Sequence, residues 1–186
     1  MASFFSHLLN TFGLGGSDSS ASSVSASANG STGVSLALKV PNTSFVSGSE
    51  QVYVAQPGGA TITATDSNPH IIIGSTGTDH LTGGSGADLI IGGTGTNILT
   101  GGGGTDTFGH QAGATDYITD FFPASGEHIA LAQGLSYTSS TTTTVTPSSI
   151  GLSGNTPVAS EALTFSDGST VTLVGSTEHP SSSWFI

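Results

Sequence analysis

A nine-residue repeat between Gly74 and Gly109 constrains this chain more than any other feature. It runs through four consecutive units without insertion: GSTGTDHLT, GGSGADLII, GGTGTNILT and GGGGTDTFG. Glycine occupies positions one and four of every unit, position six is aspartate or asparagine, and position eight is a large apolar residue. A flexible glycine-rich linker has no reason to keep polar and apolar residues in phase. The repeat therefore predicts a stack of similar structural units.

Each unit divides naturally into a six-residue turn and a three-residue strand. Tight turns need backbone angles that glycine adopts at low cost. The residue at position eight points inward, because neighbouring strand residues face opposite sides. Two units complete one coil of a parallel β-solenoid, so the turns of alternate units stack. On one side Asp88 and Asp106 stack, and on the other Asp79 stacks with Asn97.

Stacked glycine turns present backbone carbonyls and position-six oxygens around one gap. Such an all-oxygen cage suits Ca²⁺, a hard cation with loose angular demands. The candidate metal-binding residues in the repeats are Asp79, Asp88, Asn97, Asp106, Gly77, Gly86, Gly95, Gly104, Ser75, Gly84, Gly93 and Gly102.

The number of carboxylates ranks the two gaps. Asp88 and Asp106 supply two carboxylates, whereas Asp79 and Asn97 supply one carboxylate and one amide oxygen. We expect the first gap to be the tighter, with dissociation constants of about 10⁻⁴ to 10⁻³ M. Residues 65–73 fit the same register as a degenerate unit with His70 at position six, and its gap should be weak or empty.

The pattern G-G-x-G-x-D-x-U-x resembles the RTX (repeats-in-toxin) calcium-binding family. This resemblance implies an all-β protein built on a parallel β-roll, or β-solenoid, with Ca²⁺ as its cofactor. It also implies secretion by the type I apparatus to the outside or the cell surface of a Gram-negative bacterium.

Two C-terminal segments add to the resemblance. Asp116, Ile118, Asp120 and Phe121 form a D-x-I-x-D-F arrangement, which is similar to the cap that closes the roll of serralysin proteases. By that resemblance Asp116 or Asp120 completes a last calcium site; alternatively, both carboxylates cap strand ends without metal. The final residues, SSSWFI, resemble an uncleaved type I export signal.

The rest of the chain divides by composition. Five apolar residues, Phe4, Phe5, Leu8, Leu9 and Phe12, form one stripe of a predicted N-terminal amphipathic helix. That helix either docks on the body of the protein or hooks another subunit or a surface. The expected segments are the helix at 1–14, a Ser/Gly-rich linker at 15–33, a β flank at 34–64, the calcium-binding roll at 65–118 and a C-terminal β cap at 119–186. In the cap, residues 137–146 and 162–174 are expected to be strands, with a hairpin turn at Asp167 and Gly168.

Charge and composition exclude several functions. The net charge is -11, with a single lysine and no arginine, so nothing could neutralise the phosphates of nucleic acid or an anionic membrane. No run of apolar residues is long enough to span a membrane. Without cysteine there is no disulfide and no thiolate zinc site. The start of the chain does not have the pattern of a cleaved secretory peptide.

Positions seven and nine point away from the solenoid interior. In the second and fourth units and the degenerate unit they include Ile71, Ile73, Leu89 and Ile91, so this even face is apolar and needs a cover. The cover is either the C-terminal segment of the same chain or a partner subunit.

Catalysis is not predicted. The six histidines form no H-E-x-x-H pair, and no G-x-S-x-G precedes a helix pattern. We therefore expect a secreted protein that folds on Ca²⁺ and serves as a self-associating component of a surface, a matrix or an adhesive layer, as a homo-oligomer or polymer. The alternatives are a small RTX enzyme or accessory module, and a ligand-binding or ice-binding roll that uses Thr94, Thr96 and Asn97.

Overall fold

A computed structural model describes residues 23–28, 31–37 and 51–186 of the chain, with side chains from residue 51 onward. The described part consists of β-strands and three short 3-10 helices, η1 (Pro123–Ser125), η2 (Pro147–Ile150) and η3 (Ser182–Trp184). The amphipathic helix predicted over 1–14 lies outside the described residues.

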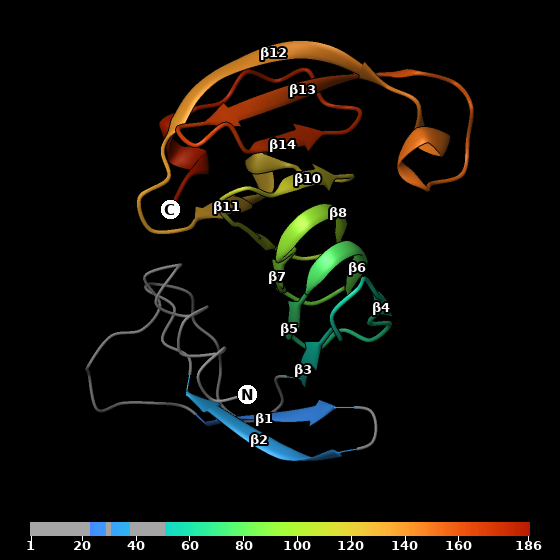
Figure 1. Cartoon of the computed structure of the whole chain (residues 1–186), viewed down its shortest axis with the longest axis vertical. Coiled ribbons are helices and arrows are strands. Elements are labelled where there is room, and N and C mark those ends of the chain that lie inside the picture. Colours follow the sequence, from blue (N-terminus) through green and yellow to red (C-terminus); the bar gives the residue numbers. More distant parts are fainter. Residues whose placement is uncertain (1–22, 29–30, 38–50) are drawn as a thin grey trace.

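The strands form two sheets, which the chain visits alternately through the repeats (Figure 1). In sheet A the order is β11-β9-β7-β5-β3-β1-β2, and all neighbours are parallel except β1 and β2. Its strands are β1 (Ser23–Ala28), β2 (Ser31–Ala37), β3 (Gln51–Val54), β5 (His70–Ile73), β7 (Leu89–Ile91), β9 (Thr107–His110) and β11 (His128–Leu131).

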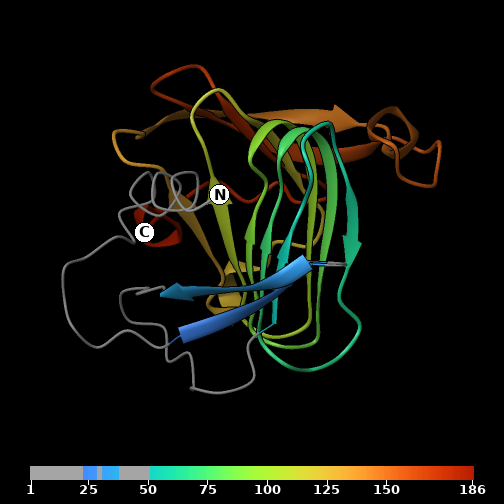
Figure 2. The ribbon, with the colours of Figure 1, turned by 60° about the horizontal axis from the view of Figure 1, so that its bottom comes forward.

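Sheet B has the order β12-β13-β14-β10-β8-β6-β4. Its strands are β4 (Thr61–Thr63), β6 (Thr76–Gly84), β8 (Thr94–Gly102), β10 (Thr115–Ile118), β12 (Tyr137–Val145), β13 (Val158–Phe165) and β14 (Thr170–Leu173). From β4 to β14 the pairing is parallel, so successive coils superpose (Figure 2). This confirms the predicted parallel solenoid, although the stacking runs from β3 to β11 and so extends beyond the 65–118 range at both ends.

The interior is built from the position-eight residues, as predicted. Ile72, Leu81, Ile90, Leu99 and Phe108 come alternately from sheets A and B, and each is no more than 1% exposed. One large apolar side chain from each unit thus fills the space between the sheets. Its burial offsets the conformational entropy lost in ordering a glycine-rich chain.

The odd units differ from the predicted division into turn and strand. Sheet A strands have three or four residues within the repeats, but β6 and β8 each have nine. Their pairing begins at Thr76 and Thr94 and continues through Gly84 and Gly102, so it includes the turn residues. Because equivalent turns lie in register, their backbone groups pair across coils as strand residues do.

The segment predicted as a linker over 15–33 contains β1 and the first residues of β2. These strands pair with each other and extend sheet A beyond β3. Strand pairing uses backbone hydrogen bonds, which small Ser and Ala residues provide as well as large residues do. Composition alone therefore misled the prediction here.

The C-terminal segment continues sheet B. The predicted strands are confirmed as β12 and as the β13–β14 hairpin, where Gly168 has φ +85°. The loop after β12 approaches the outer side of sheet B, since a Cβ added at Gly151 would lie 2.9 Å from Cε1 of His80. Of the two covers expected for the even face, the C-terminal segment does not supply its strands, because β12, β13 and β14 extend sheet B and the even face belongs to sheet A.

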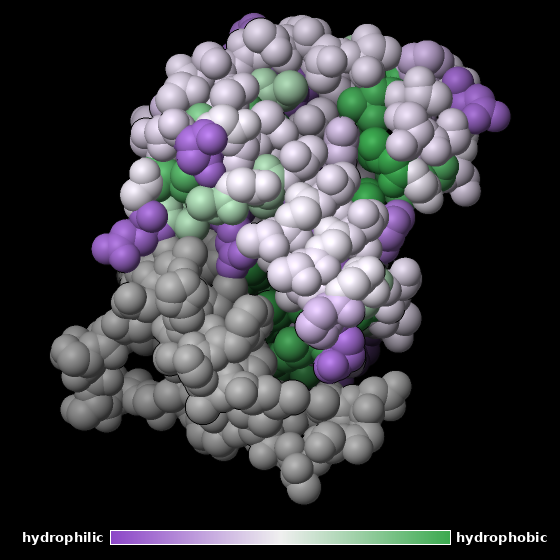
Figure 3. All heavy atoms as spheres, in the orientation of Figure 1, coloured by the Kyte–Doolittle hydropathy of each residue, from purple (hydrophilic) through white to green (hydrophobic). Residues whose placement is uncertain are grey.

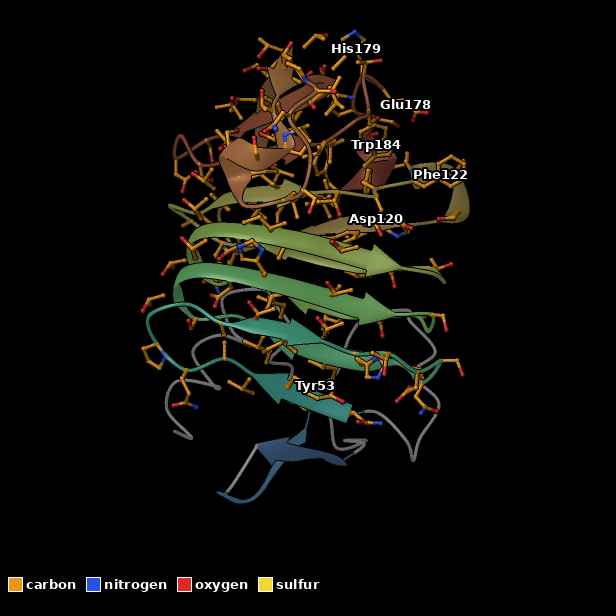
Figure 4. All side chains as sticks on the ribbon, turned by 90° about the vertical axis from the view of Figure 1, so that its right-hand side faces the viewer. Tyr53, Asp120, Phe122, Glu178, His179 and Trp184 are labelled. Carbon is orange, nitrogen blue, oxygen red and sulfur yellow. The ribbon has the colours of Figure 1, made fainter. Side chains whose placement is uncertain are left out.

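The last residues close the edge of sheet A. The tail pairs with β11 at this edge, since the Ile186 N–H donates to Ile129 O and the Leu131 N–H donates to Ile186 O, both at 3.1 Å. Trp184 is 7% exposed, and its ring packs edge-on against Phe121 with centroids 5.3 Å apart. Figure 4 shows Trp184 above Asp120 and Phe122 at this end of the roll.

Candidate metal centre

Position-six residues of the even units form one buried column, which we call the even column. It contains His70, Asp88 and Asp106 in successive coils, because Ile71 pairs with Leu89 and Leu89 pairs with Thr107. Glu127 continues the column, because His128 pairs with Thr107. The four side chains are at most 7% exposed, so three carboxylates and one imidazole lie stacked away from water.

In each of the two central carboxylates, only one oxygen accepts a hydrogen bond. The His70 N–H donates to Asp88 Oδ1 at 2.7 Å, and the Asp88 N–H donates to Asp106 Oδ1 at 2.8 Å. The Oδ2 atoms of Asp88 and Asp106 are buried without a hydrogen-bond partner. A buried charged oxygen without a partner is strongly unfavourable, so both atoms call for a cation or a proton.

Backbone oxygens converge on the same gap. A Cβ at Gly83 would lie 2.3 Å from both Asp88 Oδ2 and Gly101 O. A carboxylate oxygen of one turn and a carbonyl oxygen of the next coil therefore meet beside a residue that has no side chain. Position one is glycine here because of this close approach, since the backbone of Gly83 is not in the left-handed region.

The electrostatics of the even column favour neutralisation. Burial, together with the charges of Asp88, Glu127 and Asp120, raises the pKa of Asp106 to about 7. Burial also raises the pKa of Asp88 and of Glu127. Three neighbouring acids thus resist ionisation together unless a positive charge joins them.

Histidine stands at the start of the even column, where a repeat would have aspartate. His70 Nδ1 lies 2.9 Å from Asp88 Oδ1, and its Nε2 lies 3.3 Å from Asp66 Oδ1. The imidazole therefore places nitrogen atoms where a repeat would place carboxylate oxygens, and the weak or empty first gap stays a prediction.

The odd column is satisfied largely by hydrogen bonds. Asp79 Oδ1 accepts from the Ala60 N–H at 2.6 Å, and its Oδ2 accepts from the Ser75 N–H at 2.7 Å. In the next coils, Asn97 Nδ2 donates to Asp116 Oδ1 at 2.8 Å, which leaves Asn97 Oδ1 buried without a partner. Both columns therefore exist as predicted, but their needs for a cation differ.

The two C-terminal aspartates take different places. Asp116 continues the odd column, in register with Asn97. Asp120 lies beside the even column, where its two oxygens accept from the N–H groups of Gly101 and Gly102 at 2.9 and 2.7 Å. The structure thus does not bring the two together.

Glu127 and His110 were missed by the sequence analysis. Glu127 accepts from the Phe122 N–H at 2.9 Å and lies outside the nonapeptide repeats, so no period pointed to it. The signal that could have found it is the Gly126-Glu127 pair directly before an apolar strand, which repeats the order of a turn glycine, an acid and a core residue. His110 Nδ1 lies 2.6 Å from Asp116 Oδ2.

His110 also completes a serine–histidine–aspartate sequence of contacts. Its Nε2 lies 2.9 Å from Ser169 Oγ, and that hydroxyl donates to Asp167 Oδ1 at 2.5 Å. Ser169 is 5% exposed and its proton is already engaged, so no substrate could meet a free nucleophile here. We interpret the chain of contacts as a structural link between β9, β10 and the β13–β14 turn.

Carboxylates alone do not make a complete metal site. Within residues 51–186, no three His, Cys, Asp or Glu side chains converge as a metal-binding group. A cation in the even column would therefore need turn carbonyls beside the carboxylates, and the Gly101 carbonyl stands in such a place. This mixed oxygen set fits Ca²⁺ and is a poor match for Zn²⁺, which prefers nitrogen and sulfur.

The fold and the columns together define a calcium-type parallel β-roll. A family model for the RTX calcium-binding nonapeptide repeat matches residues 73–108, in four copies. Residues 73–108 are therefore RTX calcium-binding repeats, and the described part of the chain has the β-roll that fits such repeats. Repeats of this kind are typical of secreted proteins of Gram-negative bacteria.

A search of curated proteins found no match. No helix in the described part of the chain has both the length and the hydropathy of a membrane span.

Proposed function

We propose that this protein is a secreted calcium-dependent folding unit that serves as a self-associating structural component of a surface or matrix. The observation that carries the calcium-dependent part is the pair of buried, unpartnered oxygens, Asp88 Oδ2 and Asp106 Oδ2. In the low-calcium cytosol these acids destabilise the coil, so the chain stays loose enough for export. Outside the cell, Ca²⁺ binds the folded form and stabilises it.

The tighter calcium site is proposed between Asp88 and Asp106, with carbonyls of the stacked turns as the remaining ligands. A weaker site is proposed between Asp79 and Asn97, because Asp79 already has protein donors at both oxygens. A bound ion supplies charge neutralisation and cross-links successive turns. At a calcium concentration of ten times Kd, one site adds about 1.4 kcal/mol to the free energy of unfolding.

Calcium-dependent folding is tested by circular dichroism of the full chain during a calcium titration. We expect chelated protein to lose β-structure and millimolar calcium to restore it. The variant Asp88→Asn should require more calcium than wild type, and Glu178→Gln is the control, because Glu178 is exposed and distant from both columns. A wild-type spectrum that is unchanged by exhaustive chelation contradicts the proposal.

Self-association is supported by the free edge of sheet B. Strand β12 is the terminal strand of that sheet, has nine residues, YTSSTTTTV, and carries neither charge nor proline (Figure 1). Long edge strands without charges are templates for pairing with another chain. Antiparallel pairing of two β12 strands would form a two-fold symmetric dimer.

The character of the surface agrees with such a role. The described face in Figure 3 is mostly pale, with scattered hydrophilic and hydrophobic patches, because Ser, Thr and Gly form much of it. The solvent-exposed residues of β12 include Thr138, Ser139, Thr141 and Thr144. Because β12 carries no charged side chain, charge repulsion between two β12 strands would not oppose their pairing.

Size measurements with calcium test the self-association. We expect light scattering after gel filtration to show dimers or larger species, and Ser139→Lys/Thr141→Lys to shift the population toward monomer. Ser153→Lys/Asn155→Lys adds the same charge to exposed loop positions and should behave as wild type. A strictly monomeric wild type at high concentration contradicts this part of the proposal alone.

The enzyme alternative receives little support from the described surface. A pocket of about 480 Å³ at the C-terminal end is lined by Leu131, Leu135, Tyr137 and Phe185 with serines and Pro180, and it contains no acidic or basic side chain. The ice-binding alternative would use threonine rows. Thr76 and Thr94 form a row of two, and a row of five contains Thr78, Thr96, Thr115, Thr170 and Thr164. Only Thr78 and Thr96 of the longer row are exposed, so the rows do not present a wide flat array of hydroxyl groups.

Export through the type I apparatus is proposed from the tail. Trp184 is buried and Ile186 pairs with β11, so the signal-like residues belong to the folded structure. Recognition of this segment by an export channel would therefore precede folding.

A further inference from the structure

The outer face of sheet A is apolar and almost completely buried. Ile71, Ile73, Leu89 and Ile91 flank the inward residues Ile72 and Ile90, so they point away from the interior of the roll. Ile71 pairs with Leu89 and Ile73 with Ile91, which joins them into one patch. Each is only 2–3% exposed, and none belongs to the interior cluster. Something other than the roll's own core therefore covers them.

The described elements are placed elsewhere. Strands β12, β13 and β14 extend sheet B, and the loop after β12 approaches His80 on the outer side of that sheet. The tail pairs with the edge of β11. Strands β1 and β2 continue sheet A sideways, so they lie in its plane and not on its face. The described part of the chain thus offers no strand or 3-10 helix as the cover.

We propose that residues 1–14 of the same chain cover this patch. Their stripe of Phe4, Phe5, Leu8, Leu9 and Phe12 is the complementary apolar surface in the sequence. The segment contains no Asp, Glu, Lys or Arg, so packing it against the roll buries no charged side chain. The roll would then have three layers, with the N-terminal segment outside sheet A.

Chain geometry permits this arrangement. Strand β1 begins at Ser23 and is separated from β7 only by β3 and β5, which corresponds to about 14 Å across the sheet. Residues 15–22 can span up to about 27 Å. A helix of 14 residues is about 21 Å long, enough to cross the patch. A short tether also gives an effective concentration in the millimolar range, which favours the segment of the same chain over a second copy.

The two roles expected for the N-terminal stripe differ in whether it is free in the isolated protein. As a hook for another subunit or surface, it would remain free in the isolated protein. As the cover of sheet A, it contributes to the stability of each single chain and leaves association to other surfaces.

Hydrogen exchange on the full chain in calcium tests the proposal. The variant Phe5→Asp/Leu9→Asp should raise amide exchange in β5 and β7 at least tenfold and increase binding of an apolar dye. The matched variant Ser6→Asp/Asn10→Asp adds the same charge to the polar side of the segment and should exchange as wild type. Circular dichroism shows whether each variant keeps its roll, so loss of the cover is distinguished from loss of the fold.

Three results would overturn the proposal. Unchanged exchange in β5 and β7 of the stripe variant would show that another segment protects the patch. Exposure of the patch by Phe45→Asp, but not by the stripe variant, would assign the cover to residues 38–50. Protection of wild type that disappears on dilution would assign the cover to a second copy. All three are independent of whether calcium drives folding.

Discussion

Asp88 and Asp79 occupy the same position in their repeats but have different partners. Asp88 Oδ2 has none, whereas Asp79 Oδ2 accepts from Ser75. The carboxylate of Asp88 therefore contributes more to the free energy of calcium binding than that of Asp79 does. We expect Asp88→Asn to weaken the tighter calcium-binding step at least tenfold, and Asp79→Asn to change it less than threefold. Isothermal titration calorimetry measures both, and equal losses would refute the ranking of the two gaps.

Asp106 gives the calcium-free protein a distinct dependence on pH. Its pKa is raised to about 7 in the folded state, mainly by burial, so the folded chain binds the proton more tightly than the unfolded chain. This stability is fully present below pH 4 and is lost as pH rises through 7. At about 1.4 kcal/mol per pKa unit, the loss amounts to a few kcal/mol at most.

Denaturant unfolding in calcium-free buffer at pH 5 and pH 8 checks this expectation. We expect greater stability at pH 5, and Asp106→Asn should flatten the difference because the amide does not titrate. Saturating calcium should remove the loss at pH 8, since the ion replaces the proton. A calcium-free protein that is more stable at pH 8 would contradict the assignment.

Position four of the third unit, Gly95, requires glycine for two reasons: its backbone is left-handed, and there is no space for a side chain. Gly95 has φ +105°, and a Cβ there would lie 2.2 Å from Gly77 O. Gly113 has φ +74° but nothing within 4 Å of an added Cβ. We therefore expect Gly95→Ala to cost at least about 2 kcal/mol more than Gly113→Ala, which carries only the backbone strain. Thermal unfolding in calcium measures the difference.

Residue-level prediction succeeded where the period was intact. The repeat located both columns and the interior residues, because a fixed spacing of nine residues also fixes which side chains stack. Glu127 and His110 lie after the last repeat, where the spacing changes, so only their partners in the folded chain reveal them. The role of position-one glycines was also hidden, because close approach between coils leaves no local signature.

Among the elements, the C-terminal tail reaches the core through an aromatic contact. Trp184 packs against Phe121, which in turn lies edge-on to Phe108 in the core, with centroids 6.1 Å apart. We expect Trp184→Ala to destabilise the calcium-bound protein by about 3–5 kcal/mol. Ile186→Ala removes a side chain that is 54% exposed and should cost less than about 1 kcal/mol. Similar losses for both would mean that the tail acts only through its backbone pairing.

Backbone pairing determines where the strands begin and end more than composition does. Strand β12, which is rich in threonine, and the β13–β14 hairpin, which has an Asp-Gly turn, were predicted within a few residues. The Ser-rich segment that contains β1 was predicted as a linker, because no large side chain marks it as a strand. The sequence also did not predict which sheet the C-terminal strands join. An alternating pattern shows that one face of a strand is buried, but it does not identify the neighbouring strand.

At the scale of the whole molecule, the parallel roll was predictable because repetition overrides local ambiguity. Four in-phase units allow few architectures besides a stack. The ends have no repeated neighbour and are therefore specified by single interactions: a histidine in place of an acid at one end, and antiparallel strands with a paired tail at the other.

That contrast between uniform middle and unique ends has a consequence for how such proteins change length. Equivalent residues of successive coils are 18 positions apart, as Asp88 and Asp106 are. A duplication of one full coil within the repeats would add a strand to each sheet and another rung to each column, while both termini kept their present surroundings. Gene slippage in this region could thus lengthen the protein in whole steps and raise its calcium capacity, without inventing a new boundary.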